Sequence, residues 1–260
     1  MIDELLDSDA LTNAFQPIFH LQSGNVYAHE VLGRVRPMPH WDPAPSPTEL
    51  LDLAYEHGML LDVEHRWRAE AVAAIARSGA PGLFFLNVDT RILDDPRFRP
   101  GNTSDLVARH GLLRSRFVFE ITERDPALRA RRLSELLGHY SAQGYGIALD
   151  DLGAGHSSLH VLVQLRPDLV KLDRELCSGV ANDPMRRALV DALVTFATRV
   201  NLRLVAEGIE QADDLNVLME LGVQYGQGFL LGRPQPEPLG VSVRRLPPGR
   251  ETRDAHMIAV

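Results

Sequence analysis

Short apolar runs recur along the chain, and most of them stop at a polar side chain. Six such runs begin at Leu83, Phe117, Ile147, Leu169, Arg203 and Tyr225. Runs of this length are typical of parallel strands that are buried on both faces. Segments with helical spacing of apolar residues lie between them. The clearest follows Asn182-Asp183-Pro184 and carries one apolar stripe, made of Met185, Leu189, Ala192, Leu193, Phe196, Ala197 and Val200.

Two runs near the N-terminus form a different unit. Residues 15–21 and 26–34 have strand character, and Ser23-Gly24-Asn25 between them has the composition of a hairpin turn. Such a short turn favours antiparallel pairing of the two strands. The proline-rich residues 37–47 predict a surface loop, because proline is excluded from the interior of regular elements. Helices are expected after this loop, at about 48–57 and 61–78.

The polar residues that end the runs recur at the spacing of βα units. The steps are 33 residues from Asn87 to Glu120, 30 to Asp150, 21 to Lys171 and 36 to Glu207. About eight strands in ~250 residues fit a (β/α)8 barrel, whose active site lies at the carboxyl ends of its strands. A doubly wound open sheet is the alternative, but it would concentrate polar residues at one switch point.

We therefore predict an α/β fold, a TIM-like (β/α)8 barrel whose first strand is antiparallel. The composition becomes rich in proline, arginine and glycine from about Pro234. We expect a single domain over residues 1–240 and a C-terminal tail over residues 241–260.

A closed barrel would bring the polar strand ends together around one mouth. These residues are Glu30, Asn87, Glu120, Asp150, Asp151, Lys171, Glu207 and Gln227. Oxygen ligands without histidine or cysteine select Mg²⁺ or Mn²⁺. Two ions bridged by Asp150 could clamp the attacking and leaving oxygens of a phosphodiester displacement. Lys171 could orient or deprotonate a water there, since neighbouring cations lower the pKa of a lysine.

Simpler interpretations exist for the same residues. Asp150 and Asp151 could be a helix cap and a solvated acid, and Lys171 could pair with Asp173 at the barrel rim. Arg34 could be an ordinary surface cation. His156 and His160 are spaced to bind zinc on one helical face, although no third ligand is evident. We interpret Trp41, Trp67 and Cys177 as packing residues.

Composition narrows the function classes. The formal net charge of −8 argues against a DNA-binding surface, although metal ions would let an acidic protein bind an anionic substrate. The single cysteine excludes an internal disulfide. No apolar run approaches the ~20 residues that cross a bilayer, and the acidic N-terminus lacks the basic region of a signal peptide. We expect a cytoplasmic protein that is not associated with a membrane.

From about Phe15 to Pro234, the sequence resembles that of a known family. The chain resembles the EAL family of cyclic di-GMP phosphodiesterases in a series of short stretches that occur in the family's order. They are Gln16-Pro-Ile, Glu30-Val-Leu-Gly-Arg34, Asn87, Glu120-Ile-Thr-Glu123, Asp150-Asp151-Leu-Gly-Ala-Gly, Lys171-Leu-Asp173, Glu207-Gly-Ile-Glu210 and Gln227-Gly-Phe. The resemblance implies hydrolysis of cyclic di-GMP to linear pGpG and a barrel with an antiparallel first strand.

The resemblance also implies roles for individual residues. One Mg²⁺ or Mn²⁺ would be held by Glu30, Asn87, Glu120 and Asp150, and the second by Asp150, Asp151 and Glu207. Lys171, Glu207 and Glu30 would form the catalytic group. Substrate binding would fall to Arg34, Gln16, Asp173 and Gln227, and loop anchoring to Glu123 and Glu210. Calcium is expected to inhibit, because it is larger and tolerates looser geometry.

The chain departs from the family pattern in the turn after Asp151. Leu152, Ala154 and His156 replace the usual Phe, Thr and Tyr, which bears on regulation more than on chemistry. The alternative function is therefore a degenerate member that binds cyclic di-GMP, or a protein, without hydrolysis. Family members commonly dimerise around this turn and its following helix, so we expect a homodimer. A sensory or signalling partner in trans would supply any input.

Overall fold

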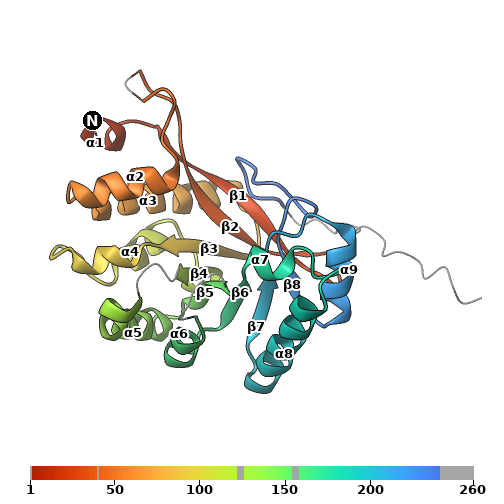
Figure 1. Ribbon diagram of the computed structural model, residues 1–260. Coiled ribbons are helices and arrows are strands. Elements are labelled where there is room, and N and C mark those ends of the chain that lie inside the picture. The colour runs from red at the N-terminus through yellow and green to blue at the C-terminus, as the bar shows by residue number, and fades with distance from the viewer. Residues whose placement is uncertain (1, 40, 122–125, 154–157, 241–260) are drawn as a thin grey trace, which may run out of the picture.

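Eight strands close into a barrel in sequence order (Figure 1). The computed structural model describes residues 2–39, 41–121, 126–153 and 158–240. Strand β1 (Leu11–His20) is antiparallel to both of its neighbours, β2 (Val26–Val35) and β8 (Tyr225–Gly226). All the other neighbouring strands are parallel. The predicted barrel with an antiparallel first strand is confirmed, and the open-sheet alternative is wrong.

The remaining elements follow the predicted alternation. The other strands are β3 (Leu83–Val88), β4 (Phe117–Ile121), β5 (Gly146–Leu152), β6 (Leu169–Leu172) and β7 (Arg203–Ala206). The helices are α1 (Ile2–Leu6), α2 (Pro47–Glu56), α3 (Leu60–Ser78), α4 (Asn102–Arg109), α5 (Pro126–Ala142), α6 (Ser158–Leu165), α7 (Arg174–Cys177), α8 (Pro184–Val200) and α9 (Ala212–Glu220). Two 3-10 helices are η1 (Thr90–Asp94) and η2 (Arg114–Arg116). In the part of the chain that the structure describes, no helix combines the length and apolarity needed to span a bilayer.

The barrel interior is filled by two layers of side chains. The lower layer is an apolar plug with one residue from each of β1 to β7, namely Ile18, Ala28, Phe85, Val118, Ala148, Leu169 and Val205. Alternate residues of a strand point to the same side, so the next interior layer begins two residues nearer the mouth. That layer is polar and contains Gln16, Glu30, Asn87, Glu120, Asp150, Lys171 and Glu207. The plug therefore forms the floor on which the polar groups rest.

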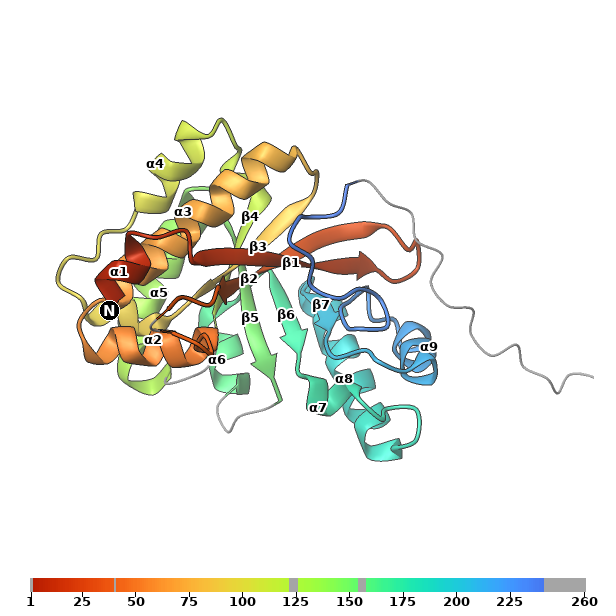
Figure 2. The same cartoon turned by 90° about the horizontal axis from the view of Figure 1, so that it is seen from above.

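The hairpin of β1 and β2 extends beyond the barrel and has no helix between its strands (Figure 2). A C-terminal segment covers part of its outer edge. The Phe15 N–H donates to the Gln235 carbonyl at 2.7 Å, and the Gln235 N–H donates back at 2.9 Å. The Leu239 N–H donates to His29 Nε2 at 3.0 Å. The chain beyond Pro234 is therefore part of the fold, while the predicted tail over 241–260 lies outside the described residues.

Helix α8 begins as predicted, but only part of its apolar stripe packs against the barrel, namely the buried Ala197 and the half-buried Leu193. Its N-cap, Asp183, accepts the Met185 N–H at 2.9 Å, and Pro184 follows as the first helical residue. The large apolar side chains of the stripe are exposed, with exposed fractions of 77% for Met185 and 40% for Phe196. The buried residues are the smaller Val190 and Ala197. Periodicity predicted the helix correctly, but short side chains face the barrel because they permit close approach.

Candidate functional site

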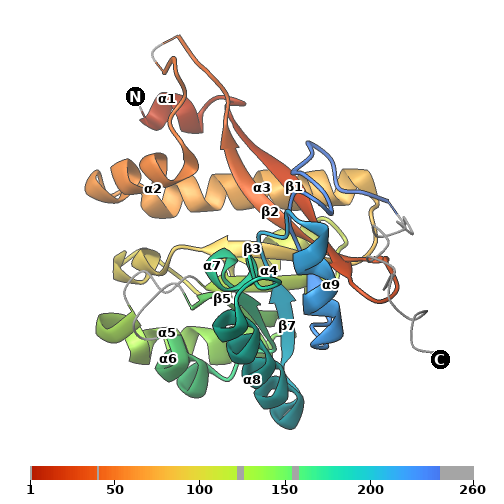
Figure 3. The same cartoon turned by 45° about the vertical axis from the view of Figure 1, so that its right-hand side comes forward.

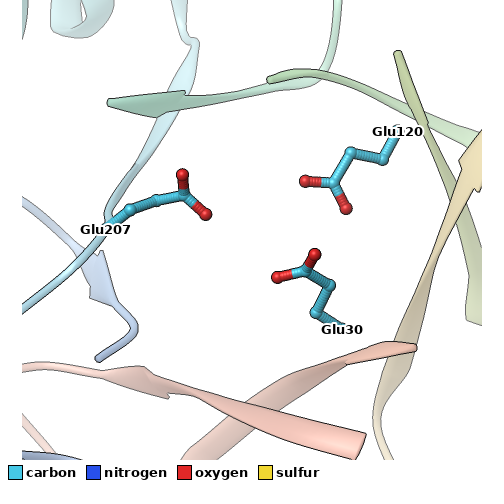
Figure 4. A group of neighbouring side chains, drawn as sticks. All are labelled: Glu30, Glu120 and Glu207. Carbon is cyan, nitrogen blue, oxygen red and sulfur yellow. The ribbon is translucent and has the colours of Figure 1, made fainter. Parts of the chain in front are cut away.

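The polar layer converges on one buried ammonium group. Lys171 on β6 is 1% exposed, and its Nζ lies 3.2 Å from Glu30 Oε2, 3.2 Å from Asp150 Oδ1 and 2.6 Å from Glu207 Oε1. Glu120 forms a further ion pair with the same atom. Figure 4 shows the carboxylates of Glu30, Glu120 and Glu207 pointing toward one another from three sides of the barrel. Five strand ends that are distant in sequence therefore meet at Lys171.

The charges in this cluster do not balance. One ammonium faces four carboxylates, which leaves a formal charge of −3 when all of them are ionised. Burial, opposed by Lys171, raises the pKa of Glu207 to about 8 and holds the pKa of Glu120 well above its usual range. Burial alone would lower the pKa of Lys171, but the surrounding carboxylates raise it well above its usual value. The cluster is thus an electrostatic site for additional cations.

The donor set fits divalent metal ions. Glu30, Glu120 and Glu207 each offer one oxygen within 4.8 Å of the others, and so do Asp150, Asp151 and Glu207. Glu120 Oε1 contacts Lys171, but Oε2 accepts no hydrogen bond from the described residues and is available as a ligand. All-oxygen sets of this kind suit Mg²⁺ and Mn²⁺. Glu207 is common to both groups, whereas the sequence-based expectation made Asp150 the shared ligand.

A bulge lets two adjacent carboxylates reach the mouth. Neighbouring residues of a regular strand point to opposite faces, so Asp150 and Asp151 could not both face inward. The pairing of β5 with β6 shifts between Leu149 and Leu152, and Asp151 adopts a left-handed φ of 58°. A bulge with an unfavourable backbone angle of this kind is typical of functional sites. The alternative of a helix cap and a solvated acid is not what the structure shows for Asp150, which is 8% exposed.

A chain of amides holds Glu30 in place. Gln227 Nε2 donates to Glu30 Oε2 at 2.5 Å and to Gln16 Oε1 at 3.1 Å. Gln16 Nε2 in turn donates to the Gly232 carbonyl at 3.1 Å. Asn87, on β3, donates to the other Glu30 oxygen at 3.4 Å. Groups that orient a ligand from behind are a regular part of metal sites.

Other candidate residues lie at the rim or outside the cluster. Arg34 lies beyond Glu30 near the end of β2. Its guanidinium donates a hydrogen bond to the Gly33 carbonyl at 2.8 Å. Asp173 caps α7 by accepting the Glu175 N–H at 2.6 Å, so the alternative pairing of Asp173 with Lys171 is wrong. Glu210 pairs with Arg174 at 3.2 Å. Their predicted roles in substrate binding and loop anchoring stay predictions.

Part of the predicted site cannot be placed. Glu123, the turn over residues 154–157 and the side chain of His160 lie outside the described residues. The expectations about loop anchoring, regulation through the turn and a zinc pair therefore stay untested.

Sequence reasoning missed a buried polar network behind the mouth. Glu64 on α3 pairs with Arg68 one turn later and accepts the Asp89 N–H at 3.1 Å. Trp67, which we had interpreted as a packing residue, donates its indole N–H to the Arg34 carbonyl at 3.3 Å. The sequence did contain a sign of this network, because Glu64 and Arg68 are oppositely charged and lie four residues apart on an otherwise apolar helix face.

Comparison with known proteins identifies the chain's relatives. A family model described as "EAL domain" matches residues 1–234. The cyclic di-GMP phosphodiesterase RocR of Pseudomonas aeruginosa is 30% identical over 235 residues, which are 89% of this chain and 59% of RocR. The cyclic di-GMP phosphodiesterase PdeF of Escherichia coli is 29% identical over 85% of this chain and 29% of its own length. The chain thus spans less than two thirds of either relative.

A solved structure supports the same relationship. It is described as PaMucR phosphodiesterase in complex with c-di-GMP, and it matches with a TM-score of 0.78 and 29% identity. The match covers 90% of this chain and 96% of that chain. The barrel fold is therefore shared with a protein of about the same extent.

Proposed function

The chain belongs to the EAL domain family, and we propose that it is a metal-dependent phosphodiesterase that hydrolyses cyclic di-GMP to linear pGpG. The observation that carries this proposal is the cluster at Lys171. Four carboxylates, of which those of Glu30, Glu120 and Asp150 are buried, face one ammonium, and every position that matches a metal ligand still has an oxygen-bearing side chain. RocR and PdeF are both named as cyclic di-GMP phosphodiesterases, which supports the same substrate here.

The residues at the mouth would divide the work between two metal ions, Mg²⁺ or Mn²⁺. By the family pattern, Glu30, Asn87, Glu120 and Asp150 would hold one ion and Asp150, Asp151 and Glu207 the other, while the clustered oxygens would also let Glu207 serve both ions. When bound, the ions would supply positive charge for the phosphate and lower the pKa of water. The unpartnered Oε2 of Glu120 and the surplus negative charge support this assignment.

The chain's own groups would position the substrate and the water. Lys171 would hold the attacking water from the centre of the cluster, and Arg34 would bind a phosphate oxygen at the rim. Gln227 would keep the Glu30 carboxylate oriented through its hydrogen bond, and Gln16 would hold Gln227 in place. Calcium would inhibit, because its longer bonds and variable geometry would loosen this arrangement.

The proposed homodimer has a candidate surface on α6 and α8. The exposed large apolar residues there are Leu159 and Val163 on α6, with Met185, Leu189, Phe196 and Val200 on α8. The two helices follow one another along the same side of the barrel (Figure 3). Apolar groups of this number on neighbouring helices are typical of an interface. We therefore place the contact between two copies here, and a signalling partner could act through it.

A degenerate receptor is the second candidate function. The unusual turn after Asp151, with Leu152 in place of the family's Phe, is the observation that favours it. A receptor would bind cyclic di-GMP without cleaving it. The intact set of carboxylates favours the enzyme, because a pure receptor has no need for a catalytic lysine among them.

One incubation separates the two candidates. Purified protein with Mn²⁺ or Mg²⁺ and cyclic di-GMP is expected to yield pGpG, detected by chromatography, whereas Ca²⁺ should suppress the product. Binding of the intact nucleotide by calorimetry, with no pGpG at micromolar enzyme and either metal, would support the receptor instead.

A further inference from the structure

Helix α3 packs against β1 and against η1, beside the ends of β2 and β3 that carry Arg34 and Asn87. It bears two polar side chains, Glu64 and Trp67, that turn toward those strand ends rather than toward solvent. Both are at most 9% exposed. A buried polar group on a packed helix needs a partner, so what these groups contact indicates what they do.

Trp67 fixes the backbone that carries Arg34. Its indole N–H donates to the Arg34 carbonyl at 3.3 Å, and Asn13 Nδ2 donates to the Trp67 carbonyl at 3.4 Å. Gly33 lies flat against the ring, since a Cβ there would sit 2.8 Å from Trp67 Cε2. The strand can approach this closely only because residue 33 has no side chain. Trp67 thus fixes the position of the Arg34 backbone, from which the Arg34 side chain extends.

Glu64 fixes the turn that follows Asn87. One oxygen accepts the Asp89 N–H at 3.1 Å, and the other pairs with Arg68 Nη2 at 2.5 Å. Arg68 also donates to Thr103 Oγ1 at 3.3 Å. A buried ion pair seldom adds net stability, whereas this one ties α3 to the turn after Asn87. The bonded N–H lies only two residues beyond Asn87.

We propose that α3 positions both sides of the mouth, with Trp67 as the positioning residue for Arg34 and Glu64 as the positioning residue for Asn87. The inference rests on the proposed function, because Arg34 and Asn87 matter only when a phosphate and a metal ion bind them. The proposal predicts that substrate affinity and metal affinity change independently, whereas a general packing defect would weaken both. Trp67 affects substrate affinity, and Glu64 affects metal affinity.

The first experiment replaces Trp67→Phe, which keeps an aromatic ring but removes the N–H together with the larger indole. The KM for cyclic di-GMP should rise roughly threefold to tenfold, the usual range for one lost hydrogen bond, with kcat within about twofold. The Mn²⁺ dissociation constant, measured by calorimetry, should stay unchanged. Trp41→Phe is the matched control, since Trp41 is also buried and its indole N–H has no partner among the described residues. An unchanged KM, or the same change in both variants, overturns the proposal.

The second experiment compares two double variants that lack the buried charge pair equally. Glu64→Gln with Arg68→Met keeps an oxygen for the Asp89 N–H, whereas Glu64→Leu with Arg68→Met does not. The leucine variant should bind Mn²⁺ roughly threefold to tenfold more weakly by calorimetry, at equal KM for the nucleotide. Equal metal affinity in the two folded variants overturns the role of Glu64. If the leucine variant fails to fold, Glu64→Met with Arg68→Met, which also has no oxygen for the Asp89 N–H, takes its place in the comparison.

These outcomes are distinct from failure of the proposed function. If the wild-type protein yields no pGpG, the phosphodiesterase proposal fails before α3 is tested. If the wild type turns over and Trp67→Phe behaves like Trp41→Phe, only the positioning role fails.

Discussion

The mouth of the barrel and the outer face of α8 violate the usual distribution of side chains in opposite ways. At the mouth, Glu30, Glu120 and Asp150 are buried although they are charged. On α8, Met185 and Phe196 are exposed although they are apolar. Each arrangement costs free energy in the isolated chain, because charges lose hydration and apolar groups keep contact with water. Each is therefore best explained by what binds there.

The two regions differ in how they would be stabilised. Cations would relieve the repulsion at the mouth, and a second copy of the chain would cover the α8 face. The mouth depends on exact placement, since its groups come from seven strands and are held by amide hydrogen bonds. The face depends only on exposed apolar side chains along one side of α6 and α8. A change in one region should therefore leave the other intact.

The largest effect should follow from changing the mouth. Lys171→Ala, and likewise Glu30→Ala, should reduce pGpG formation by about a thousandfold or more, because water loses its positioning group or the metal loses a ligand. Circular dichroism and the oligomeric state should be unchanged. Arg187→Ala, which removes an exposed cation paired with Glu220, is the control and should retain activity. A Lys171→Ala enzyme with more than about a tenth of wild-type turnover would contradict the proposed mechanism.

A smaller effect should appear as a pH dependence of stability. The pKa of Glu207 is raised to about 8 in the folded, metal-free protein, above its ordinary 4.5. The folded state therefore binds a proton that the unfolded state has already lost. Stability should fall as pH rises from about 4.5 to 8, by at most about 1.4 kcal/mol for each pH unit.

Urea unfolding of the metal-free protein at several pH values measures this slope. Glu207→Gln, which carries no titrating group, should lose less stability over the same range. Added Mn²⁺ should reduce the loss in the wild type, because bound cations favour the carboxylate. Identical slopes in the two proteins would show that Glu207 has an ordinary pKa.

The smallest effect on catalysis should come from the α8 face. Leu189→Glu with Phe196→Glu should convert a dimer to a monomer in analytical ultracentrifugation, because like charges would meet across the contact. The Mn²⁺ affinity should remain that of the wild type. Asp191→Lys, on another side of α8, should leave the dimer intact. Dimers that persist in the double glutamate variant would place the contact elsewhere.

The sequence predicted the strands better than it predicted the helix faces. Asn87, Glu120 and Glu207 each follow an apolar run, and the parallel strands of a closed barrel must bring such residues to one rim. No comparable rule of the barrel fold determines which side of helix α8 faces the strands. A stripe at helical spacing indicates that apolar groups gather on one side, but it does not say whether that side faces the barrel or solvent.

The sequence alone determined the number and order of the strands, the antiparallel hairpin and the residue types available at the mouth. Local patterning suffices for these, because side-chain period and turn chemistry act over a few residues. Only the tertiary structure decided that Asp150 and Asp151 both reach the mouth through a bulge, and that Lys171 stands between four carboxylates. It also decided that Trp67 contacts the Arg34 backbone. These features depend on register and close packing between distant segments, which no local pattern encodes.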